Sequence, residues 1–102
     1  MASRFPRLGI LPEAEKIARH ANERFADPRG FEHYVKGVRP DDLDAYVDGV
    51  LEGVVPNVEK RYLDRGRIGY WDPDKKAVII EEGDGGTVFT PTEGKTYFDE
   101  LD

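Results

Sequence analysis

The most restrictive feature of this sequence is a change in the spacing of its apolar residues at Pro56. Before that proline, apolar residues recur at three- and four-residue intervals, which is the period of an amphipathic helix. After it, β-branched and aromatic runs (IGYW, AVII and TVF) alternate with turn-forming segments (DPDKK and EGDGG). The pattern predicts an α+β domain, with N-terminal helices followed by a small antiparallel β-sheet.

The first half of the chain is predicted to hold two helices and a shorter helical segment. The first helix runs from about Pro12 to Ala26, and FEHYVKG (31–37) forms one or two further turns. Asp41 or Asp42 is expected to cap the second helix, and Gly53 is expected to end it in a left-handed conformation. That helix carries one continuous apolar stripe, formed by Leu43, Tyr46, Val47, Val50 and Leu51.

Turn signals divide the second half into three predicted strands. Asp72–Lys76 is expected to connect a strand near Arg67–Trp71 to one at Ala77–Glu82. A looser turn at Gly83–Gly86 leads into the strand Thr87–Thr90. The closing segment TYFDEL fits either a last helical turn or a closing strand.

The length of 102 residues predicts a single domain. Within it, residues 1–10 are expected to form an N-terminal tail, residues 12–53 the helical part and residues 65–98 the sheet part. The N-terminus is too weakly apolar for a signal peptide, so the default expectation is a cytosolic protein.

Composition argues against several kinds of site. With no cysteine and two histidines, a structural zinc centre is not expected, and no metal or other cofactor is predicted. No apolar run approaches the roughly 20 residues that span a bilayer, so no membrane association is expected. Ser3 is the only serine and lies in the predicted tail, which excludes a serine hydrolase.

The net charge of −6 argues against sequence-independent binding to nucleic acid, because neutralising phosphates requires a basic face. The charge is nevertheless uneven along the chain. Its acidic residues concentrate in the segments 41–48, 81–84 and 99–102, whereas four cations cluster at Lys60, Arg61, Arg65 and Arg67. A small site with local cations therefore remains compatible with the composition.

Three residues carry side chains suited to phosphate chemistry. His33 could exchange a proton near neutral pH, or it could be a partly buried histidine that bonds to the backbone. Arg67 could grip a phosphate through parallel hydrogen bonds, or it could be an exposed charge at a strand end. Thr87 is predicted to share a strand face with Phe89; its hydroxyl could donate to a phosphate, or the residue could simply favour the strand.

Three aromatic residues, Tyr70, Trp71 and Tyr97, are more typical of a core or its rim than of a catalytic site. His20, on the first predicted helix, is more typical of the boundary of an apolar stripe, because a lone histidine needs no special function.

Taken in order, the segments FEHYVKGV, DAYVDGVL, GRIGYWDPDKKAVII and DGGTVFTPTEGKTYF resemble a known family. They are similar to the C-terminal RNase toxin domains of bacterial polymorphic and contact-dependent inhibition proteins, whose fold is related to barnase, EndoU, colicin-type tRNases and RelE. The resemblance covers roughly residues 31–98. It rests on a histidine in the helical part, a Gly-Arg before an aromatic-Asp strand, and a closing Thr-x-Phe-x-Pro strand.

This resemblance implies metal-independent cleavage of RNA, with tRNA as one candidate substrate. By position, the histidine of the pattern falls on His33, the arginine on Arg67 and the threonine on Thr87, with Tyr97 as an assisting residue. The resemblance also implies a cognate immunity protein as a partner. It further implies synthesis as the C-terminal part of a larger exported protein that acts in the cytoplasm of a target cell.

A different class of function also fits the sequence. The acidic net charge and the acidic segment Asp41–Glu52 would suit a non-catalytic domain that binds a basic protein, such as an immunity or regulatory module.

Overall fold

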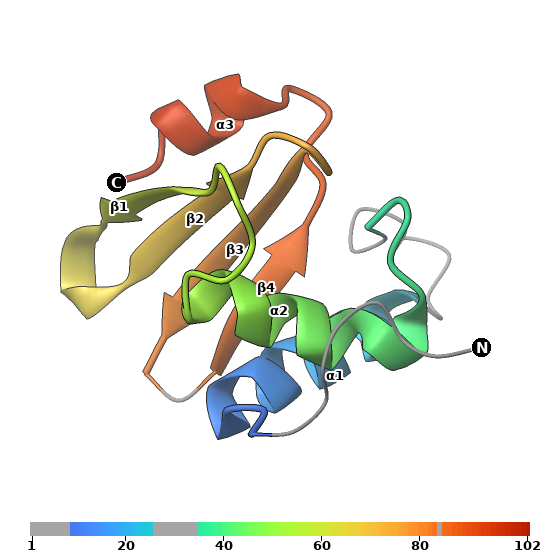
Figure 1. The fold of residues 1–102 in the computed structure, drawn as a ribbon. Coiled ribbons are helices and arrows are strands. Elements are labelled where there is room, and N and C mark those ends of the chain that lie inside the picture. The colour runs from blue at the N-terminus through green and yellow to red at the C-terminus, as the bar shows by residue number, and fades with distance from the viewer. Residues whose placement is uncertain (1–8, 26–34, 84) are drawn as a thin grey trace.

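Helices precede the sheet along the chain, as the apolar spacing predicts (Figure 1). The computed structural model describes residues 9–25, 35–83 and 85–102. Helix α1 spans Pro12–Phe25, and helix α2 spans Leu43–Leu51 directly after the 3₁₀ turn η2 at Pro40–Asp42. The α+β prediction is confirmed, because a small antiparallel sheet follows these helices.

The sheet has four antiparallel strands in the order β1-β2-β3-β4, so each strand pairs with its neighbour in the sequence. Strands β2, β3 and β4 correspond to the three predicted strands. Strand β1 was missed by the sequence reasoning, because its residues EKRY lack an apolar run. The strands are β1 (Glu59–Tyr62), β2 (Ile68–Asp72), β3 (Ala77–Glu82) and β4 (Gly85–Phe89).

The closing segment, which the sequence left undecided, is the short helix α3 at Lys95–Asp99. Helices α1 and α2 cover one face of the sheet, and α3 lies across the other (Figure 1). Because both faces are covered, consecutive residues of β3 are all buried from Ala77 to Ile80. This explains why the strand reads as a continuous apolar run instead of an alternating one.

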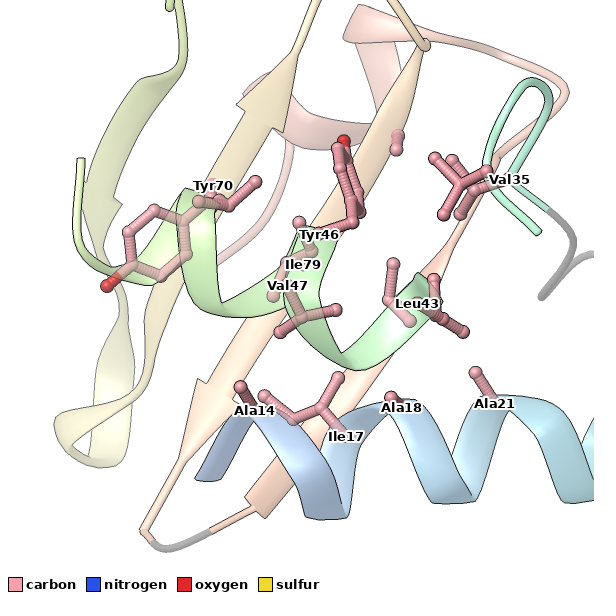
Figure 2. Packing of buried hydrophobic residues seen from close by; sticks show 14 residues of the cluster. Ala14, Ile17, Ala18, Ala21, Val35, Leu43, Tyr46, Val47, Tyr70 and Ile79 are labelled. Carbon is pink, nitrogen blue, oxygen red and sulfur yellow. The ribbon is translucent and has the colours of Figure 1, made fainter. Parts of the chain in front are cut away.

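The larger apolar cluster lies between the sheet and the two long helices, and Figure 2 shows its packing. The apolar stripe of α1 points towards α2, and α1 also packs directly against β4, while α2 contacts β2. Two valines that flank Gly37, Val35 and Val38, are also buried in this cluster. Its members from the sheet are Tyr70, Ala77, Ile79 and Val88.

A second cluster lies beneath α3, where Phe98 is fully buried. The Phe98 and Trp71 rings stack with centroids 6.4 Å apart. A Cβ at Gly69 would lie 3.2 Å from Leu63 Cδ1 and 3.4 Å from the Phe98 ring, so the glycine leaves room for both side chains. The cluster is completed by Leu63, Val78 and Ile80, with Phe89 and Leu101 partly buried at its margin.

One turn matches its predicted chemistry, and two glycines of the other predicted turn, Gly85 and Gly86, belong to strand β4. Residues 73–76 connect β2 to β3, and the Asp74 amide donates to Asp72 Oδ1 at 2.9 Å, as expected of an aspartate-initiated turn. On β4, Gly86 has φ 146°, and a Cβ at this position would collide with the carbonyl oxygen of Ile80. Only glycine fits there, because its lack of a Cβ permits both the conformation and the close approach.

The predicted helix ends are only partly confirmed. Gly53 has φ 78°, the left-handed conformation expected after α2. Asp42 occupies the N-cap position of α2, but its side chain makes no capping hydrogen bond, so that part of the prediction is wrong. Its backbone there is near-helical because η2 leads directly into α2, whereas a capping residue needs an extended backbone. Most of the predicted segment 31–37 lies outside the described residues; its last residues form a turn closed by Val38 N–H donating to Val35 O.

Candidate functional site

Thr87 lies on the sheet face that α3 covers. It is the register partner of Ile80, whose side chain belongs to the cluster beneath α3, while the next residue, Val88, points into the opposite cluster. The predicted alternation along this strand is therefore confirmed. The Thr87 side chain is half-buried and Phe89 follows it on the same face.

Arg67 precedes β2 and its guanidinium reaches the C-terminal end of the chain. Nε donates to the carbonyl of Asp64 at 3.1 Å, and one Nη donates to the carbonyl of Asp102 at 3.3 Å. Neither acceptor belongs to a side chain, and the guanidinium stays protonated near neutral pH. An arginine has five donor hydrogens, and two such bonds leave donors for a further anion.

The third described candidate, Tyr97, extends from α3 and is 39% exposed. Its ring meets the Phe89 ring edge-to-face, with centroids 5.3 Å apart. Phe89 stands two residues after Thr87 on β4, so Tyr97 borders the same stretch of that strand. The fourth candidate, His33, lies outside the described residues.

Three of the predicted site residues thus share the α3 side of the sheet, although they come from three separate segments. Gly69, Ile80 and Thr87 form one row of register partners across β2, β3 and β4. With strands about 4.8 Å apart and about 3.4 Å per residue, the backbones of Arg67 and Thr87 are roughly 12 Å apart. That distance is too great for direct contact between the two side chains, and the buried side chains of Leu63, Ile80 and Phe98 cover the row between them.

Two further cations on this side hold the last helix in place, and the sequence reasoning assigned them no role. Arg61 of β1 donates to the carbonyl oxygens of Phe98 and Leu101, the latter at 2.9 Å, so it caps the C-terminal end of α3. Lys95 bonds Asp99 at 2.8 Å and lies 3.6 Å from Glu59; the bond to Asp99 is the main cause that raises the pKa of Lys95. One member of the cationic cluster seen in the sequence, Arg61, therefore has a structural role.

A polar pair is buried on the opposite face of the sheet. The Tyr46 hydroxyl donates to Asp72 Oδ2 at 2.6 Å, and both side chains are almost fully buried. Burial, with a smaller contribution from the Asp72 bond, raises the pKa of Tyr46 far above its usual value. Burial and the bond that its hydroxyl donates to Glu81 likewise raise the pKa of Tyr70. Neither tyrosine is therefore suited to act as a base near neutral pH.

A groove of about 600 Å³ lies between α1 and the start of α2. Its charged lining is mainly acidic, with Arg19 as its one cation among the described residues. The acidic residues are Glu15 and Glu23 from α1, and Asp41 and Asp44 from η2 and α2. The groove therefore brings part of the acidic segment 41–52 together with carboxylates that are distant in the sequence.

Within residues 9–25, 35–83 and 85–102, no three His, Cys, Asp or Glu side chains come together in a way that could hold a metal ion. Nor does any helix in those ranges have the length and apolar character needed to cross a membrane. Comparison with protein-family models, with curated proteins and with solved structures found no match to this chain.

Proposed function

We propose that this domain cleaves RNA without a metal ion. The observation that carries the proposal is the placement of Arg67, Thr87 and Tyr97 on one side of the sheet, where the resemblance to RNase toxin domains requires them to act together. In this mechanism, the 2′-oxygen of a ribose attacks the adjacent phosphorus and the bond to the 5′-oxygen breaks. The products are a 2′,3′-cyclic phosphate and a free 5′-hydroxyl.

Each residue has a defined role in the proposed reaction. His33 takes the proton of the 2′-hydroxyl or supplies one to the leaving 5′-oxygen. Arg67 stabilises the negative charge that develops on the phosphate, and the Thr87 hydroxyl donates to a non-bridging oxygen. Tyr97 assists from α3, at the margin of the same surface.

Incubation with tRNA and total RNA in the presence of a chelator tests the proposal. Thr87→Val removes the hydroxyl and keeps the shape, and it is expected to lower the cleavage rate about 10²- to 10³-fold, the cost of removing one donor to a developing charge. Thr92→Val makes the same change at an exposed position and is expected to cleave like the wild type. His33→Ala is expected to lower the rate about 10²- to 10⁴-fold.

Two results would refute the proposal. One is the absence of cleavage by the wild-type protein, and the other is unchanged cleavage by His33→Ala. Arg67 is less informative on its own, because its replacement also releases the carbonyls of Asp64 and Asp102.

The groove between α1 and η2 favours a second candidate, a non-catalytic domain that binds a basic protein. Four carboxylates there would complement lysine and arginine side chains of a partner. Expression separates the two functions: an active RNase should be toxic to bacteria unless a partner or an inactivating substitution protects them. Easy expression of the unmodified protein would favour the binding function.

A further inference from the structure

The first strand of the sheet presents an aromatic ring to solvent. Tyr62, the last residue of β1, is 77% exposed, more than any other large apolar or aromatic side chain in the described part of the chain. β1 is an edge strand, paired on one side only with β2. Charged residues at such an edge are common because they discourage pairing with other chains. That reason accounts for a lysine at the edge, but it does not account for an exposed tyrosine.

One cation contacts this ring, and another follows it three residues later in the sequence. Lys60 Nζ lies 5.1 Å from the centre of the Tyr62 ring and 5.9 Å from that of Tyr70. Arg65 lies in the loop between β1 and β2, is exposed and has a positive φ of 63°. Within the described ranges, neither the Lys60 ammonium nor the Arg65 guanidinium is paired with a carboxylate.

The segment 59–67 carries a net positive charge although the protein is acidic. Residues 59–67 hold four cations and two acids, which leaves a net charge of +2. Of the two acids, Glu59 lies 3.6 Å from the Lys95 ammonium, so its charge is partly compensated. Arg61 and Arg67 in this segment donate to main-chain oxygens, and their guanidinium groups stay protonated.

An exposed aromatic ring beside cations matches the way proteins bind single-stranded nucleic acid. A base stacks on the ring while the neighbouring cations contact the phosphates. A duplex cannot be bound in this way, because its bases are stacked on one another. Lys60 and Tyr62 are the register partners of Tyr70 and Ile68, which pack in the cluster beneath α1 and α2, so this surface lies on the face of the sheet opposite the candidate site.

We propose that Lys60, Tyr62 and Arg65 form a binding surface for single-stranded RNA at the β1 edge of the sheet. This inference rests on the proposed function only in naming the bound strand as the substrate. The surface itself is defined by exposure and charge on the β1 edge. Tyr62 stacks on a base, and Lys60 and Arg65 contact phosphates.

Binding is measured by fluorescence anisotropy with a labelled single-stranded 2′-O-methyl RNA octamer. This probe lacks the 2′-hydroxyl and cannot be cleaved by the proposed reaction, so binding is read independently of activity. Tyr62→Ala is expected to weaken binding about 5- to 150-fold, the usual cost of losing one stacked base, whereas Tyr62→Phe keeps the affinity. Val54→Ala, at an apolar side chain that is 70% exposed, is the matched control and should bind like the wild type.

The cations are tested through the salt dependence of the same binding. Replacing Lys60 and Arg65 together by alanine should lower the slope of log K against log salt concentration by about 1.4, which corresponds to two phosphate contacts on a single strand. An unchanged slope would overturn their role. Equal affinity of the wild type for a duplex of the same sequence would overturn the role of stacking.

The two proposals can fail separately. If the octamer binds through Tyr62 but unmodified RNA is never cleaved, the surface stands and the proposed function fails. If RNA is cleaved but Tyr62→Ala changes neither octamer binding nor the KM for RNA, the function stands and the surface is wrong. Because the Tyr62 ring is exposed, loss of folding is not expected, and an unfolding curve like that of the wild type verifies this.

Discussion

The buried bond between Tyr46 and Asp72 gives the sharpest test of how the fold is stabilised. Tyr46→Phe removes the hydroxyl and leaves the ring in place. Asp72 then loses the donor at 2.6 Å, and with its side chain 1% exposed it has little access to water as a replacement. A hydrogen bond to a charged group contributes about 1.5–3 kcal/mol, so we expect a loss of about 2 kcal/mol. For a chain of this size, that corresponds to a fall in Tm on the order of 10 °C.

The same pair makes the size of this loss depend on pH. The pKa of Tyr46 is raised in the folded state, so its contribution to stability is fully present below its usual pKa near 10 and is lost at higher pH. In the unfolded chain the phenol ionises, which costs the wild type on the order of 1 kcal/mol of stability at pH 11. The variant has no phenol to ionise at this position. The difference in unfolding free energy between the two proteins should therefore shrink from about 2 kcal/mol at pH 8 to about 1 kcal/mol or less at pH 11.

Urea unfolding at pH 8 and pH 11 measures both quantities. Tyr62→Phe makes the same chemical change on an exposed ring and should match the wild type at pH 8. A Tyr46→Phe protein within about 0.5 kcal/mol of the wild type at pH 8 would refute the reasoning, because that is the range of unimportant surface substitutions. A difference that does not narrow at pH 11 would refute the part that concerns ionisation.

Three further perturbations test other parts of the fold. Gly86→Ala forces a Cβ against the backbone of the neighbouring strand at φ 146°, so urea unfolding should show a loss above about 3 kcal/mol; Gly85→Ala would place its Cβ in ordinary contact with Lys16 Cβ at 3.9 Å and should cost less than about 1 kcal/mol. Arg61→Ala removes two hydrogen bonds to carbonyls at the end of α3. It should lower the free energy of unfolding by about 2 kcal/mol and speed amide exchange in that helix, whereas Arg65→Ala should change neither quantity. Asp48→Ala removes the carboxylate that accepts from the Leu11 amide, at 2.8 Å, just before α1. It should lower the stability measured by thermal unfolding by about 1–2 kcal/mol, and Asp48→Asn, which keeps an acceptor, should lower it less.

Sequence reasoning succeeded where apolar spacing and turn residues act locally. The stripe of α2, the turn at residues 73–76 and the opposite facing of Thr87 and Val88 all follow from such signals. It failed for β1, because a charged strand is recognised only through its pairing with β2. Sequence reasoning also could not predict contacts between distant segments, such as the bonds from Arg61 to the end of α3 or from the Leu11 amide to Asp48.

The candidate site was also only partly predictable from the sequence. The residue types at Arg67 and Thr87 suggested phosphate chemistry from the sequence alone. The engagement of Arg67 by carbonyls at residues 64 and 102 could not be foreseen, since it depends on where the end of the chain lies. The exposure of Tyr62 likewise depends on β1 being an edge strand.

The covering of both sheet faces has a consequence for how the strands find their alignment. If β3 slipped by one residue against β2, the side chains of its two apolar clusters would change places, yet every exchanged residue from 77 to 80 would still be apolar. Hydrophobic burial alone therefore discriminates weakly between the native and the slipped sheet. The native alignment is instead distinguished by polar and steric features at the strand ends. These are the hydrogen bonds of the two Asp72 oxygens and the requirement for glycine at position 86. Substitutions at these two positions should therefore produce misaligned sheets as well as unfolded chains.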